Sequence, residues 1–161
     1  MSESGNGWVQ CTMGHRHWGR FGAAGVLITD GQQVMLQHRA VWTHEGGTWA
    51  VPGGARDSHE SAVTAALREA AEETDVDLNR IEPYREWIDD PGGWAYTTVL
   101  ARALDGLGAK DPRPVNAESI AIRWWPIDEV EALPLHYGFA GTWPRLRELI
   151  LGLTGPDRVA R

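Results

Sequence analysis

Three glutamates lie at helical spacing in the middle of the chain: Glu69, Glu72 and Glu73. Residues three and four positions apart project from one face of an α-helix, so these carboxylates are expected to share a face. Like charges at this spacing destabilise a helix by roughly a few tenths of a kcal/mol per pair, so we expect a cation to offset them. Magnesium takes oxygen ligands and is commonly held by one or two carboxylates together with substrate phosphates. The spacing therefore predicts a helix face that could hold a divalent cation against a phosphate chain.

The helix that would carry these acids is predicted to run from about residue 58 to residue 74, because this segment is rich in Ala, Leu, Glu and Arg and has no Gly or Pro. Ser58 is the predicted N-cap, and Glu60 would lie in the first turn, where the helix dipole favours an anion. Arg68 is expected to pair with Glu72, four residues later. A second face should turn away from the acids and be buried: Val63, Leu67, Ala70 and Thr74.

A run of charges taken alone usually indicates a solvated helix face, but the residues around this run resemble the Nudix box of the Nudix (MutT-like) hydrolases. That motif reads Gly, five residues, Glu, seven residues, Arg-Glu-aliphatic-x-Glu-Glu-x-Gly-aliphatic. The matching residues are Gly54, Glu60, Arg68, Glu69, Glu72, Glu73 and Val76, with Ala70 in the first aliphatic place. Asp75 departs from the motif, which has Gly there. We expect this place to need a left-handed backbone, which Asp tolerates better than most residues.

The resemblance implies a mixed α/β fold, the α/β/α sandwich of the Nudix family. It also implies a hydrolase that uses water and Mg2+ or Mn2+ to cleave the pyrophosphate linkage of a nucleoside diphosphate derivative. By position in the motif, Glu72 and Glu73 correspond to metal ligands, and Glu69 corresponds to a ligand or the general base. The backbone carbonyl of Gly53 corresponds to a further metal ligand. Structural or orienting roles fall to Gly54, Glu60 and Arg68.

Residues outside the motif could complete the site. Glu118 precedes a predicted strand and is our candidate for a fourth metal-binding acid, a solvated loop carboxylate being the alternative. His38 and Arg39 end another predicted strand and could contact a phosphate, although a surface Arg is usually only solvated. His15 and His17 resemble a metal-binding pair, but no third ligand at zinc spacing accompanies them, so we interpret both as exposed histidines.

The composition is that of one globular domain. With 161 residues, 42% of them hydrophobic, the chain is long enough for a core. We predict a single Nudix domain over residues 19–155, preceded by a polar segment, 1–18, with the composition of a mobile terminus. A net charge of −7 argues against a nucleic-acid polymer as partner. The lone Cys11 fits a reducing cytoplasm, and no apolar run approaches the roughly 20 residues of a membrane span. We expect a monomer or homodimer that binds a small nucleotide.

The remaining elements follow from apolar runs bounded by turn residues. Strands are predicted over residues 22–29, 34–38, 49–51, 84–88, 94–102 and 119–125. A helical turn is predicted over 128–132 and a closing helix over 139–151. That helix could begin near Trp143 and Pro144, because Pro is accepted in a first turn.

The motif predicts the bond that is cut better than it predicts the substrate. We favour a nucleoside triphosphate, including oxidised ones, because chain length and the position of Glu118 suit MutT-like enzymes. The alternative is ADP-ribose or a nucleotide sugar, for which Pro91, 15 residues after the motif, is a weak indication within an Asp-Pro-Gly turn. An alternative from another class is a non-catalytic Nudix domain that senses a nucleotide; such domains often lose acids of the motif, and this chain keeps them.

Overall fold

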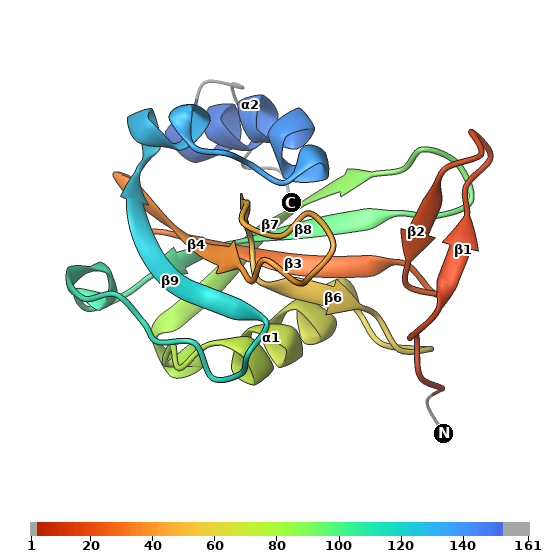
Figure 1. The fold of residues 1–161 in the computed structure, drawn as a ribbon. Helices are drawn as coiled ribbons and strands as arrows, with labels where there is room; N and C mark the ends of the chain where they lie inside the picture. Colours follow the sequence, from red (N-terminus) through yellow and green to blue (C-terminus); the bar gives the residue numbers. More distant parts are fainter. Residues whose placement is uncertain (1–2, 153–161) are drawn as a thin grey trace.

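A mixed β-sheet lies at the centre of the molecule (Figure 1), as seen in a computed structural model that describes residues 3–152. Residues 1–2 and the last part of the predicted domain, 153–155, lie outside the described residues. The strand order is β5-β4-β3-β8-β7, and β6 pairs with β3 while β9 pairs with β4. The strands are β3 (Ala23–Thr29), β4 (Gln33–Arg39), β5 (Trp49–Ala50), β6 (Gly53–Ala55), β7 (Ile81–Asp89), β8 (Tyr96–Ala103) and β9 (Ser119–Pro126).

Two helices cover opposite faces of this sheet, α1 (Ala62–Glu73) and α2 (Tyr137–Leu151) (Figure 1). Three short 3-10 helices lie in the connections: Leu78–Arg80, Leu107–Ala109 and Ile127–Ala132. Together the layers form the α/β/α sandwich that the sequence predicted.

The core is double because the central strand β3 is buried on both of its faces. Alternate residues of a strand point to opposite sides, so Val26 and Ile28 belong to the core beneath α1, while Leu27 belongs to the core beneath α2. Strand β3 runs parallel to β8 and antiparallel to β6, which leads into α1. The best-buried strand of the sheet therefore holds in place the glycines that precede the acidic helix.

Helix α1 begins later than predicted. Its N-cap is Ser61, whose Oγ accepts a hydrogen bond from the Thr64 amide at 3.1 Å. Ser58 is thus not the cap, and Glu60 lies before the helix rather than in its first turn. The Glu60 side chain turns back and accepts from the Asp57 amide at 2.9 Å. Contacts of this preceding turn, which local helix propensity does not encode, decide where the helix starts.

Helix α2 begins at Tyr137, two residues before the predicted start at Phe139 and well before the alternative start near Trp143 and Pro144. His136 is the N-cap, and its Nδ1 accepts from the Gly138 amide at 3.0 Å. Pro144 consequently lies inside the helix. Phe139 and Trp143 precede Pro144 in the helix and are buried in the core. Their burial outweighs the cost of a proline inside the helix.

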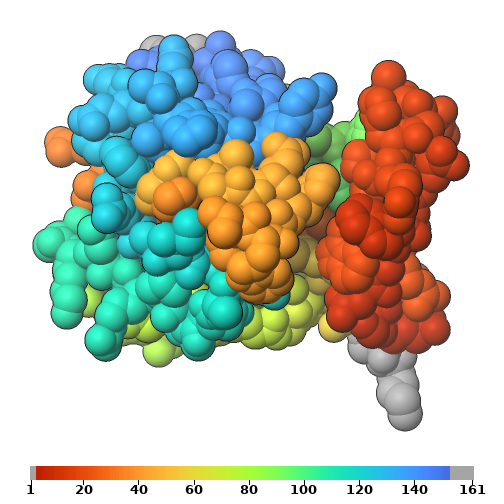
Figure 2. Space-filling view, viewed as in Figure 1, coloured from red at the N-terminus to blue at the C-terminus, as the bar shows by residue number. Residues whose placement is uncertain are grey.

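The N-terminal segment carries an antiparallel hairpin outside the main sheet, formed by β1 (Trp8–Gln10) and β2 (Arg16–Trp18). The space-filling view shows this hairpin as a separate mass at one edge of the sandwich (Figure 2). It is joined to the β7–β8 connection, because the Thr12 amide donates to the Gly92 carbonyl at 2.8 Å. Within residues 3–152, no helix is long and apolar enough to cross a bilayer.

Candidate active site

The most buried acid of the motif is Glu73, which lies at the end of α1 and is only 3% exposed. Its Oε1 accepts from the Gly53 amide at 3.1 Å, and its Oε2 accepts from Gln37 Nε2 at 3.0 Å. Gln37 also donates to Ser119 Oγ at 2.6 Å, so strands β4 and β9 help to fix this carboxylate. Burial raises the pKa of Glu73 to about 8, although the hydrogen bond from Gln37 opposes the shift.

Glu69 lies one helical turn before Glu73, and its carboxylate is packed against Gly54. A Cβ atom at Gly54 would lie 2.5 Å from the Glu69 carboxyl carbon, which explains why a glycine is needed there. Burial raises the pKa of Glu69, and the charges of Glu72 and Glu118 add to this effect, while Arg68 opposes it. The close approach of backbone and carboxylate is possible only because Gly54 has no side chain.

Arg68 joins the acids to the turn before the helix. Its guanidinium binds Glu60 through two hydrogen bonds of 2.8 Å and donates to the Ala55 carbonyl at 3.0 Å. It also reaches Glu69 Oε1 at 3.0 Å, whereas the predicted partner Glu72 is 3.4 Å away. Arg68 is therefore mainly a partner of Glu60, whose pKa it lowers. Both residues hold the turn before the helix, and their orienting role stays a prediction.

Glu118 lies on the connection into β9, and its charge contributes to the raised pKa values of both Glu69 and Glu73. The structure therefore brings this residue to the acids of α1. Its backbone is fixed by two hydrogen bonds: its carbonyl accepts from the Ala40 amide at 2.8 Å, and its amide donates to Asn116 Oδ1 at 2.9 Å. The residue itself is exposed, and its role as a metal ligand stays a prediction.

The end of α1 and the loop that carries Glu118 are joined directly. The Glu72 carbonyl accepts from Asn116 Nδ2 at 3.1 Å, and the Glu73 carbonyl accepts from the Val115 amide at 3.0 Å. The Asp75 amide donates to the Arg113 carbonyl at 3.0 Å, and the Asp75 carboxylate accepts from the Arg113 amide at 2.6 Å.

This arrangement corrects the expectation for Asp75. The non-glycine residues with positive φ in the described part of the chain are Glu45, His59 and Asp105, so Asp75 does not adopt a left-handed backbone. Its carboxylate instead accepts hydrogen bonds from the backbone and the side chain of Arg113.

The side chains of His38 and Arg39 contact the loop over residues 40–48 and Trp49, which follows it, and not the acids of α1. The His38 ring stacks on Trp49 with centroids 4.3 Å apart, and its Nε2 lies 3.1 Å from the Gly47 carbonyl oxygen. Arg39 donates to the His44 carbonyl from Nε and Nη2, at 3.1 and 2.8 Å. Their role as phosphate contacts stays a prediction.

Two polar residues that support the site were not found from the sequence. Gln37 is buried on an apolar strand, and a polar residue within that run was the available signal. Partly buried Tyr96 lies beside the glycines, its hydroxyl 2.7 Å from where a Cβ of Gly53 would stand. Burial raises the pKa of Tyr96, with a contribution from Glu73, so its hydroxyl stays protonated.

The donor set fits a hard divalent cation. The acids Glu69, Glu72, Glu73 and Glu118 offer only oxygen atoms, which suit Mg2+ or Mn2+ better than softer metals. Burial and mutual repulsion disfavour the ionised forms of Glu69 and Glu73, and a bound cation would reverse this preference. The oxygen-only donor set and the mutual repulsion of these acids thus point to a cation.

Comparisons with known proteins agree with this geometry. A family model described as the NUDIX domain matches residues 19–146. A Mycobacterium tuberculosis protein named "Putative 8-oxo-dGTP diphosphatase 3" is 47% identical over 154 residues, covering 89% of this chain and 69% of that protein. A crystal structure of a Nudix hydrolase from M. smegmatis, RenU, is 43% identical, has a TM-score of 0.79, and is matched over 94% of this chain and 98% of that one. The NUDIX domain of Shewanella oneidensis NrtR, complexed with ADP ribose, is 26% identical with a TM-score of 0.57, over 80% of this chain and 86% of that one.

Proposed function

This chain belongs to the Nudix family and is a Nudix hydrolase, and we propose that it cleaves nucleoside triphosphates at a pyrophosphate linkage, by attack of water at phosphorus. The observation that supports this proposal is the cluster of Glu69, Glu73 and Glu118 at the end of α1. The charge of Glu118 adds to the raised pKa values of Glu69 and Glu73, and the charge of Glu69 adds to that of Glu73. Exposed Glu72 extends the cluster toward solvent, where a substrate would approach.

Nudix hydrolases generally use divalent metal ions, and we propose Mg2+ or Mn2+ held by Glu69, Glu72, Glu73, Glu118 and the Gly53 carbonyl. Such an ion would neutralise the pyrophosphate and lower the pKa of the attacking water.

The chain's own residues have distinct tasks in this proposal. Gln37 and the Gly53 amide fix both oxygens of Glu73, so this carboxylate is positioned before any ligand arrives. Glu69 is oriented by Arg68 and has a raised pKa, which suits a group that accepts the proton of the water near neutral pH. The pair of Arg68 and Glu60 holds the glycine-containing turn against the helix.

The nucleoside triphosphate is favoured over ADP-ribose by similarity. The relative named as an 8-oxo-dGTP diphosphatase is 47% identical, whereas the domain complexed with ADP ribose is 26% identical. We further propose a single domain over residues 19–155, a monomer or homodimer in the cytoplasm, and a small nucleotide rather than a nucleic-acid polymer as ligand, in keeping with the net charge of −7.

The proposal is tested by a hydrolysis panel with Mg2+ or Mn2+ that contains dGTP, 8-oxo-dGTP, ADP-ribose and a nucleotide sugar. Products are separated by chromatography and identified by phosphorus NMR. We expect a triphosphate to be cleaved fastest, giving a nucleoside monophosphate and pyrophosphate. Faster cleavage of ADP-ribose would transfer the assignment to the alternative substrate class. Nucleotide binding without any turnover would favour the sensing domain.

A further inference from the structure

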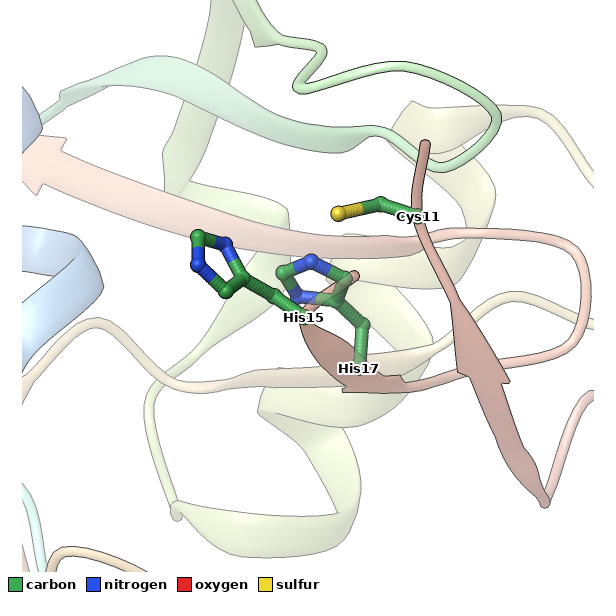
Figure 3. A group of neighbouring side chains, drawn as sticks. All are labelled: Cys11, His15 and His17. Atoms are coloured by element: carbon green, nitrogen blue, oxygen red, sulfur yellow. The ribbon is translucent and has the colours of Figure 1, made fainter. Parts of the chain in front are cut away.

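We infer that Cys11, His15 and His17 form a second metal site, for a borderline-soft transition-metal ion of the Zn2+ type, at the tip of the β1–β2 hairpin (Figure 3). One thiol and two imidazoles make up this site, whereas the acids of α1 offer only oxygen. The sequence alone left the two histidines without a third ligand, because Cys11 reaches them only through the pairing of β1 with β2.

The hairpin brings the three side chains together. The Cys11 amide donates to the His15 carbonyl at 2.9 Å and the Gly14 amide donates to the Cys11 carbonyl at 2.9 Å, which closes the turn. His15 directly precedes β2 and His17 lies within it, two residues later, so they can lie on the same side of the hairpin. Figure 3 shows the thiol and both rings directed toward one another.

The distances suit one shared ion. One ligand atom from each residue lies within 4.8 Å of the other two. Around a tetrahedral Zn2+ with a Zn–S distance of about 2.3 Å and Zn–N distances of about 2.0 Å, donor atoms are separated by about 3.3–3.6 Å. Small side-chain rotations therefore suffice to bind the ion. Three protein ligands leave a fourth position for water or for an external ligand.

A second observation comes from His17. Among the described residues, its buried Nε2 has no hydrogen-bond partner, which is unusual for a buried polar atom. The ring stacks on Trp94 with centroids 4.0 Å apart and planes 8° apart, which fixes its orientation.

The site would lock the hairpin onto the main domain. Thr12, next to Cys11, donates to the carbonyls of Gly92 and Pro91, and Trp94 Nε1 donates to the Gly19 carbonyl at 3.1 Å. An ion bound by Cys11, His15 and His17 would stabilise the hairpin turn, which contacts the loop between β7 and β8. Binding converts the Cys11 thiol to a thiolate and releases its proton to solvent, so affinity rises with pH.

The decisive experiment is a titration of the full chain with Co2+ in excess Mg2+, followed by absorption spectroscopy. Mg2+ occupies oxygen sites, and a thiolate-to-cobalt charge-transfer band can arise only from Cys11, the sole cysteine of the chain. We expect the band to saturate at about one equivalent and to disappear when Zn2+ is added. Zn2+ should also raise the melting temperature of the protein.

Variants distinguish a built site from a reactive thiol. Cys11→Ser should abolish the band, and His15→Gln, at an exposed position, should weaken Co2+ binding at least about tenfold without unfolding the hairpin. His136→Gln is the matched control, because His136 belongs to a second group, with His44 and Glu45, that contains no sulfur; it should leave the band unchanged. Absence of the band in the wild type, or an unaltered band in a His15→Gln/His17→Gln double variant, would overturn the proposal.

Discussion

Glu73→Gln should make the metal-free protein more stable at alkaline pH while removing its activity. The substitution resembles the protonated form of Glu73 in shape and charge, so the contacts to Gln37 and the Gly53 amide can be kept by reorienting amide and hydroxyl groups. The pKa of Glu73 rises from 4.5 to about 8 in the folded state. Between these two pH values the unfolded chain has lost a proton that the folded chain retains, so the stability of the wild type falls as pH rises through this window.

The magnitude follows from the shift. Each pKa unit corresponds to about 1.4 kcal/mol, so the rise of the Glu73 pKa from 4.5 to about 8 sets an upper value of about 5 kcal/mol, which is approached only above pH 8. Relaxation and water entry reduce this figure, and we expect a stabilisation of about 2–4 kcal/mol for Glu73→Gln at pH 8, and almost none at pH 4.5. Part of the pH dependence should persist in the variant, because the pKa of Glu69 is raised as well.

The assay is urea unfolding in a chelator at several pH values, for the wild type, Glu73→Gln and Glu72→Gln. Glu72→Gln is the matched control, since it makes the same chemical change on the same helix at a side chain that is 54% exposed; its stability should change by less than about 0.5 kcal/mol. If the free energy of unfolding depended on pH in the same way for the wild type and Glu73→Gln, Glu73 would not have the raised pKa inferred for it. An active, metal-dependent Glu73→Gln enzyme would refute the assignment of Glu73 to the metal site.

Three further predictions concern the same site. Gly54→Ala should reduce kcat about 10–100-fold while the fold is kept, because the new Cβ displaces Glu69; Gly141→Ala, with nothing within 4 Å of the added atom, is the control and should not affect turnover. Arg68→Lys should lower the free energy of unfolding by about 1–3 kcal/mol, measured by urea titration, because Lys cannot replace the two-pronged contact with Glu60; an unchanged value would contradict this role. Chelation should abolish hydrolysis, and Mg2+ or Mn2+ should restore it; hydrolysis that survives exhaustive chelation would exclude a metal role.

The sequence predicted what is local and missed what depends on distant pairing. Spacing along one helix brought Glu69, Glu72 and Glu73 together, since three- and four-residue intervals fix a helical face. Gln37 binds Glu73 and Ser119, which are distant in the sequence. Cys11 meets His15 and His17 only when the hairpin forms. Composition and periodicity therefore did not reveal either role. The start of α1 was misplaced because Ser58 and Ser61 have the same capping ability, and only the contacts of the preceding turn distinguish them.

The departure of this chain from its family motif also shows how the fourth acid is positioned. Asp75 stands where the motif has glycine, and it accepts hydrogen bonds from Arg113 at the start of the loop that leads to Glu118. Asn116, two residues before Glu118, donates to the last turn of α1 and also accepts from the Glu118 amide. The end of the helix and the loop that carries Glu118 are thus linked by hydrogen bonds of the Asp75 and Asn116 side chains. A single polar residue after the helix therefore helps to hold the loop that carries Glu118 close to the acids of α1.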